Sequence, residues 1–421
     1  MKKSFLPVLF ATTVLSVAAF SQSNVPHTPT SNSRVVTTNT LPPPQPKKTP
    51  VIVVGSAPST LPTPSGPGVP VAKSNASNLT YKGLSFSQIK SKIAEAKRQM
   101  QTRPLTTASV EPMTLTNSFV RIAYFDTHSG KTEYFVLSKD AFLTPNVLTT
   151  AISSNGKTVT SRTLRANGVN TPIVVMDDRG QQQVPLLVQY PVEKFGRYVE
   201  TAYYMSTHPG LVTPEVVGAG RLYVRNTIDI AREQLKSKGY LIQPKVADIA
   251  EHLAAVEHVD HLRFRTEFHP NIYNDIYTLF ALNEGQTYRY SVSSAGAGGM
   301  VQMIPSTYRM VRSRFPNALL MPDFVEGMRN HVNASQAMLL YMQMTWNDLI
   351  ASPTVLNAYS SGIATQEQLM AAGYNSNPAR LAGYINRGGA NWTSLIPRET
   401  KVYLQIYDSL TRAVNIDPRK M

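Results

Sequence analysis

The sequence contains no cysteine, which excludes disulfide cross-links, thiolate chemistry and a lipid anchor attached to cysteine. It also lacks a long apolar run after its first 20 residues, so no later segment is expected to cross a membrane. Acidic residues are scarce: 26 Asp and Glu stand against 41 Lys and Arg, which gives a formal net charge of +15 at pH 7. This basic balance indicates an acidic partner.

The N-terminus has the pattern of an export signal. Lys2 and Lys3 precede an apolar run over residues 5–20, and the small residues Ala19 and Ser21 suit a cleavage site. We therefore expect residues 1–21 to be a signal peptide and the protein to be exported to the periplasm, the cell wall or the extracellular medium. Acidic wall polymers and anionic lipids are then the expected partners, whereas nucleic acid is not.

A chain of 421 residues is too long for one compact core, and its composition changes along its length. The fold class that this predicts is α+β and multidomain. Residues 22–83 are rich in Pro, Ser and Thr and are expected to be a disordered linker. An amphipathic helix is predicted over 84–103, a β-rich auxiliary domain over 104–225, and a mainly α-helical domain over 226–421.

The β-rich domain is predicted from short β-prone runs separated by turn signals such as Ser154-Asn-Gly. These runs cover residues 119–125, 133–137, 146–152, 158–163, 172–176 and 184–189. Their spacing is typical of an antiparallel sandwich or barrel. No catalytic pattern occurs among them, so the expected role is scaffolding or binding to other components of the cell envelope.

In the helical part, apolar residues at helical spacing predict a helix over 271–283 that ends at Glu284. Gly285 is expected to end this helix in a left-handed conformation. The helix C-terminus carries partial negative charge, which favours a protonated carboxyl group and suits a general acid. The simpler interpretation is a surface Glu followed by a flexible glycine loop.

Small residues over 293–299 let the backbone approach a ligand closely, because no side chain stands in the way. The next residues return to apolar character around Gln302, whose amide must find a partner. The whole stretch resembles the signature of the soluble lytic transglycosylases, which are related to goose-type lysozymes: Glu, a spacer, Val-Ser-x-Ala-Gly-Ala-x-Gly, then x-x-Gln-x-x-Pro. Glu284, Ser293, Gln302 and Pro305 match it in order, whereas the family usually has Ser where this chain has Gly285.

Two further motifs extend the resemblance over about residues 240–410. Ala372-Gly-Tyr-Asn-Ser-Asn-Pro-Ala-Arg is similar to the family's Ala-Tyr-Asn-Ala-Gly-Pro-Gly-Arg, with Tyr374 and Asn375 matching. A rival frame places Tyr359 in the same role but lacks the Asn. Residues 397–403, Pro-Arg-Glu-Thr-Lys-Val-Tyr, are similar to the closing Pro-x-Glu-Thr-x-x-Tyr.

The resemblance implies a lysozyme-like C-terminal domain and a lytic transglycosylase acting on peptidoglycan glycan strands. It implies Glu284 as general acid and base, Ser293, Gln302, Tyr374 and Asn375 as substrate-binding residues, and no cofactor. A goose-type muramidase that uses water and a non-catalytic wall-binding protein are the alternatives.

A metal site is the other chemistry to weigh, because His252, Glu257, His258 and His261 lie close together in the sequence. No His-Glu-x-x-His motif is present, and no third ligand falls at a recognised spacing. We therefore expect ordinary surface or interface histidines and no metal.

Overall fold

The computed structural model describes residues 84–103, 119–194, 196–205 and 209–420. They all fall within one compact unit of the chain. The predicted signal peptide and the predicted linker lie outside these residues.

The first element, α1 (Phe86–Thr102), confirms the predicted amphipathic helix. Ser85 and Gln88 form a capping box at its start, each side chain bonding the other's backbone N–H. Its apolar face buries Ile89 and Met100 in a cluster shared with the sheet and with α4 and α7. The helix ends before Pro104, as the sequence predicts.

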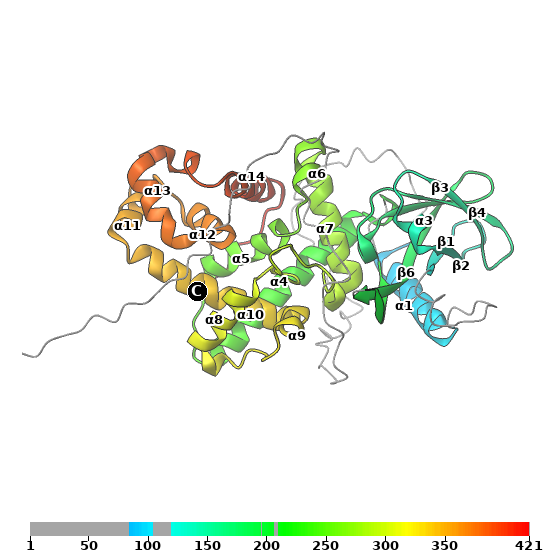
Figure 1. The fold of residues 1–421 in the computed structure, drawn as a ribbon, viewed down its shortest axis with the longest axis horizontal. Helices are drawn as coiled ribbons and strands as arrows, with labels where there is room; N and C mark the ends of the chain where they lie inside the picture. The colour runs from blue at the N-terminus through cyan, green and yellow to red at the C-terminus, as the bar shows by residue number, and fades with distance from the viewer. Residues whose placement is uncertain (1–83, 104–118, 195, 206–208, 421) are drawn as a thin grey trace, which may run out of the picture. The chain divides into compact units, whose positions relative to one another are not determined.

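The β-rich region is antiparallel, as expected, and forms a seven-stranded sheet (Figure 1). The strands run β1 (Phe119–Asp126), β2 (Lys131–Ser138), β3 (Leu148–Ile152), β4 (Thr158–Thr163), β5 (Ile173–Met176), β6 (Gln182–Lys194) and β7 (Arg197–Tyr204), with a short helix α3 (Lys139–Leu143) after β2. Their order is β2-β1-β6-β5-β4-β3, and β7 also pairs with β6.

The sheet curls, because the two ends of this order come back together. The backbone N–H of Ser154, in the β3–β4 turn, donates to the carbonyl of Tyr134 on β2, and the N–H of Tyr134 donates to Ser154 Oγ. The long strand β6 allows the curl, since it pairs with β1 and β5 near its start and with β7 over the rest of its length. The strands thus form one continuous sheet rather than two separate ones.

The rest of the described chain is helical: α4 (Pro214–Ser237), α5 (Pro244–Val256), α6 (His261–Thr266), α7 (His269–Asn283), α8 (Pro305–Arg314), α9 (Phe324–Arg329), α10 (His331–Ile350), α11 (Pro353–Ser360), α12 (Gln366–Asn375), α13 (Leu381–Gly388) and α14 (Arg398–Ala413). The side chain of Thr213 caps α4, and Pro214 occupies its first turn. The domain boundary predicted at 225/226 therefore falls inside this helix.

The predicted helix over 271–283 is confirmed as α7. The region between α4 and α7 contains two helices, α5 and α6. The break comes at Asp260, whose carboxylate caps α6 by accepting from the N–H groups of Leu262 and Arg263.

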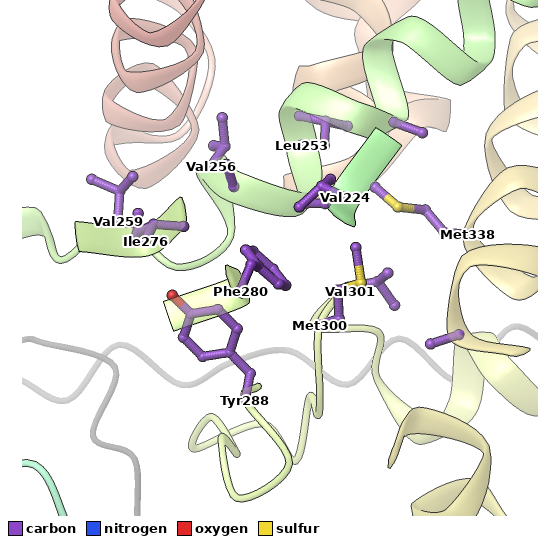
Figure 2. Packing of buried hydrophobic residues seen from close by; sticks show 14 of the residues in the cluster. Val224, Leu253, Val256, Val259, Ile276, Phe280, Tyr288, Met300, Val301 and Met338 are labelled. Carbon is purple, nitrogen blue, oxygen red and sulfur yellow. The ribbon is translucent and has the colours of Figure 1, made fainter. Parts of the chain in front are cut away.

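The core next to the predicted site is built from α4, α5, α7 and α10 together with the chain that follows α7 (Figure 2). Phe280 of α7 lies between Val224 of α4 and Tyr288, and all three are buried. Met300 and Val301 enter the same cluster from the glycine-rich stretch. The chain on either side of the glycine-rich stretch, with Tyr288 before it and Met300 and Val301 after it, is thus part of the core.

Candidate active site

Glu284 is the C-cap of α7 and has an unusual backbone, with φ +47° and ψ −127°. Its N–H donates to the Phe280 carbonyl, and its own carbonyl accepts from Thr287 N at 2.9 Å and Thr287 Oγ1 at 2.7 Å. The predicted left-handed conformation of Gly285 is wrong, because the Thr287 bonds place the positive φ one residue earlier. Such a conformation costs a residue with a side chain about 1–3 kcal/mol and persists only where the surroundings enforce it.

A pair from α4 and α10, the partly buried Tyr223 and the buried His331, supports that conformation. His331 Nε2 lies 2.8 Å from the Thr287 carbonyl, and His331 Nδ1 lies 2.9 Å from the Tyr223 hydroxyl. A carbonyl only accepts, so Nε2 carries the proton and Tyr223 donates to Nδ1. Burial lowers the pKa of His331 to about 4, and burial raises that of Tyr223. Both side chains are therefore neutral near pH 7.

The Glu284 side chain is 43% exposed and forms an ion pair with Lys90 of α1, with Nζ 2.6 Å from Oε1. The sequence predicted only the negative end of α7 beside the Glu284 carboxylate, and this prediction lacked the Lys90 ammonium group. A cation reaches the carboxylate from a helix that precedes the sheet. Tyr223 is also near, since a Cβ added at Gly285 would lie 3.9 Å from its hydroxyl oxygen.

The chain after Glu284 folds back on itself through its polar side chains. Ser293 is half-buried, and its Oγ accepts from Ala297 N at 3.0 Å, closing a tight turn. Gln302 is buried, and its Nε2 donates to the Gly299 carbonyl at 2.8 Å and to Ser291 Oγ at 3.2 Å. The amide of Gln302 thus has its predicted partner, and that partner is the loop itself.

One glycine of this loop is required by space as well as by conformation. Gly299 has φ +67°, and a Cβ placed on it would lie 2.3 Å from the Met328 carbonyl oxygen at the end of α9. No side chain fits there. His258 Nε2 lies 2.9 Å from the carbonyl of the next residue, Met300, while its ring stacks on Tyr288 at 3.4 Å. This loop, residues 293–302, therefore packs against its neighbours as a fixed surface, the platform.

The two tyrosine frames occupy different places. Tyr374, in the last turn of α12, donates from its hydroxyl to the Val301 carbonyl at 2.7 Å, next to Gln302. Tyr359, on α11, is 41% exposed and packs edge-on against Trp346. Asn375 follows Tyr374 and is half-buried. Of the two tyrosines, Tyr374 is therefore the one whose hydroxyl is bonded to the loop that contains Gln302.

The third motif lies at the start of α14 and serves a different contact. Thr400 and Tyr403 are buried and Glu399 is exposed. The Tyr403 hydroxyl donates to Glu257 Oε1 at 2.6 Å, which ties α14 to the end of α5. This hydrogen bond joins two helices and does not involve Glu284.

Sequence reasoning missed Lys90, Tyr223, Thr287 and His331. Lys90 lies in the predicted amphipathic helix over 84–103, but nothing in the sequence pattern directed it to Glu284. Tyr223 and His331 lie 108 residues apart and belong to no motif. Thr287 could have been found only by predicting the turn at Glu284, because the Thr287 hydroxyl closes that turn by donating to the Glu284 carbonyl.

A pocket of about 320 Å³ lies beside α10 and includes Tyr240, Phe315 and Leu340, none of which belongs to the predicted set. Within the described ranges, no group of three or more His, Asp or Glu could hold a metal ion. None of the helices described is both long and apolar enough to span a bilayer.

Comparison of the chain with protein-family models, with curated proteins and with solved structures found no match.

Proposed function

We propose that this protein is a lytic transglycosylase that cleaves the β-1,4 bond between N-acetylmuramic acid and N-acetylglucosamine in peptidoglycan. The observation that supports this is the placement of Glu284. It is a partly exposed carboxylate in an enforced, unfavourable backbone conformation, connected by one packed loop to the Tyr374 hydroxyl. Strain of this kind clusters at functional sites, and the spacing from Glu284 to Pro305 is that of the resembled signature.

The proposed reaction needs one carboxyl group. Glu284 donates its proton to the glycosidic oxygen as the C1–O bond breaks. The muramoyl C6 hydroxyl then attacks C1, and the Glu284 carboxylate accepts the proton that this hydroxyl loses. A 1,6-anhydromuramoyl end forms without water, so Glu284 is unchanged after the cycle. A substrate that supplies its own nucleophile removes the need for the second carboxylate of ordinary glycosidases.

The remaining residues shape and line the site. Ser293 Oγ already accepts from Ala297, which leaves its hydroxyl proton for a sugar oxygen. Gln302 acts mainly through the loop, because its Nε2 is bonded within it. Tyr374 fixes the Val301 carbonyl and with it the surface beside Gln302. Asn375 is assigned to the turn that ends α12.

The test is the product released from purified peptidoglycan sacculi, analysed by mass spectrometry after borohydride reduction. The wild-type protein should release muropeptides with anhydro ends, which resist reduction. Glu284→Gln should lower the rate by about 10² to 10⁴, the usual contribution of a general acid or base. Glu233→Gln, an exposed position on α4, is the matched control and should retain the wild-type rate.

The outcomes separate the three candidate functions. Reducible muramic acid ends would replace the transglycosylase by a muramidase that uses water. Binding to sacculi with no released product would leave a wall-binding protein. Full activity in Glu284→Gln would remove both enzymatic proposals. Circular dichroism of the variant checks the fold, which the amide should leave intact because it keeps the shape of the side chain.

A further inference from the structure

Lys90 brings α1 into contact with the proposed catalytic carboxylate. Its Nζ lies 2.6 Å from Glu284 Oε1, although the two residues are 194 positions apart. The Lys90 side chain is 32% exposed and that of Glu284 is 43% exposed, so both reach solvent. A molecule that approaches Glu284 therefore also meets Lys90.

The helix that carries Lys90 is fixed at both ends. At its start, the N–H of Phe86 donates to Glu215 Oε2 of α4 at 3.1 Å. Near its end, Arg121 Nη2 of β1 donates to the Met100 carbonyl at 2.7 Å. Ile89 and Ala96 of α1 are buried in the same apolar cluster as Ala281 and Leu282 of α7. Only the flexible side chain of Lys90 needs to move for its ammonium group to change partners.

The neighbouring cations of α1 are engaged elsewhere. Lys92 pairs with Glu95 at 3.2 Å and lies 5.9 Å from the centre of the Phe125 ring. Lys97 lies 5.9 Å from the centre of the Tyr203 ring. Lys90 is thus the lysine of this helix that is directed at Glu284.

The ion pair opposes the first step of the reaction. A carboxylate that accepts from an ammonium group at 2.6 Å holds no proton to give to a glycosidic oxygen. Glu284 has to leave Lys90 before it can act as an acid. A second anion that takes over the ammonium group would allow this exchange, and peptidoglycan carries such anions as the carboxylates of its stem peptides.

We propose that Lys90 is a specificity-determining residue: it holds Glu284 inactive in the free protein and exchanges it for a stem-peptide carboxylate of the substrate. This inference rests on the proposed function. It makes peptide-bearing glycan strands the preferred substrate, because strands without peptides leave the ion pair in place. It also gives a reason why α1, which precedes the sheet in the chain, contributes Lys90 to the site.

The experiment compares two substrates, glycan strands with their stem peptides and the same strands after an amidase has removed them. For each variant the measured quantity is kcat/KM for peptide-bearing strands divided by kcat/KM for peptide-free strands. The wild-type protein should favour peptide-bearing strands. Lys90→Met should accelerate cleavage of peptide-free strands about two- to fivefold, the worth of a partly exposed ion pair, and so reduce the ratio. Lys90→Arg, which keeps the cation, should preserve the wild-type ratio, and so should Lys92→Met.

An unchanged ratio in Lys90→Met would overturn the proposal, and so would slower cleavage of both strands, which would make Lys90 a supporting residue. Loss of the ratio in Lys92→Met as well would assign the effect to the total charge of α1. A wild-type protein that cleaves neither strand would instead refute the proposed function. Thermal melting of Lys90→Met identifies a variant that has merely lost its fold.

Discussion

Acidification should destabilise the turn that carries Glu284, because His331 is buried as a neutral ring. His331 joins Tyr223 to the Thr287 carbonyl, and Thr287 in turn holds the Glu284 carbonyl. Burial lowers the pKa of His331, so the unfolded chain binds a proton at a higher pH than the folded chain does. Stability then rises with pH wherever the unfolded state binds more protons.

The size of the effect follows from the two pKa values. The ordinary value is 6.5 and the value in the folded protein is about 4, and each unit is worth about 1.4 kcal/mol, so about 3 kcal/mol is at stake. This contribution is fully present above pH about 6.5 and is lost as the pH falls toward 4. It is a substantial share of the free energy of unfolding of a typical domain, about 5–15 kcal/mol.

The assay is urea unfolding of the wild-type protein and of His331→Gln at a series of pH values across this window. Gln keeps a neutral N–H donor for the Thr287 carbonyl but does not titrate. Other buried groups also titrate: burial lowers the pKa of His252 and raises those of Glu251 and Asp275. These groups are present in both proteins and cancel in the difference between them.

At neutral pH His331→Gln should be the less stable protein, because the Tyr223 hydroxyl loses its acceptor. The gap should close as the pH falls, since only the wild-type protein has a histidine to charge at this position. A gap that stays constant between pH 7 and pH 4 would refute the reasoning, because it would mean that residue 331 binds no extra proton on unfolding.

Two further predictions concern the platform. Gly299→Ala should lower the free energy of unfolding in urea by at least about 2 kcal/mol, because it adds a clash with the Met328 carbonyl to the cost of a positive φ. Gly296→Ala should cost only the conformational part, about 1–2 kcal/mol, because the nearest neighbour of its added Cβ lies 3.8 Å away, and equal losses in the two variants would contradict the clash. Tyr374→Phe should lower the rate of anhydromuropeptide release about tenfold or more with little change in KM, while Tyr359→Phe should match the wild-type protein, and the reverse result would move the second signature to the earlier frame.

The sequence determined the elements whose signal is local. Ile272, Ile276 and Phe280 recur at helical spacing, so α7 and the position of Glu284 at its end could be predicted from one stretch. Most strands could be predicted for the same reason, from short apolar runs between turn residues. The strand β7 was missed because its partly buried residues, Arg197–Tyr204, show little alternation. The sequence motifs also named Ser293 and Gln302, which lie on one loop, and Tyr374 of α12, whose hydroxyl donates to the Val301 carbonyl of that loop.

The tertiary structure alone decided what surrounds Glu284. Lys90 reaches it only because α1 packs against α7, and the Tyr223–His331 pair forms only because α4 and α10 meet beneath the turn. Local periodicity records which face of a helix is buried, but not which distant side chain it will meet. The conformation of Glu284 was likewise out of reach, since hydrogen bonds from Thr287 and His331 enforce a backbone angle that its own residue type disfavours.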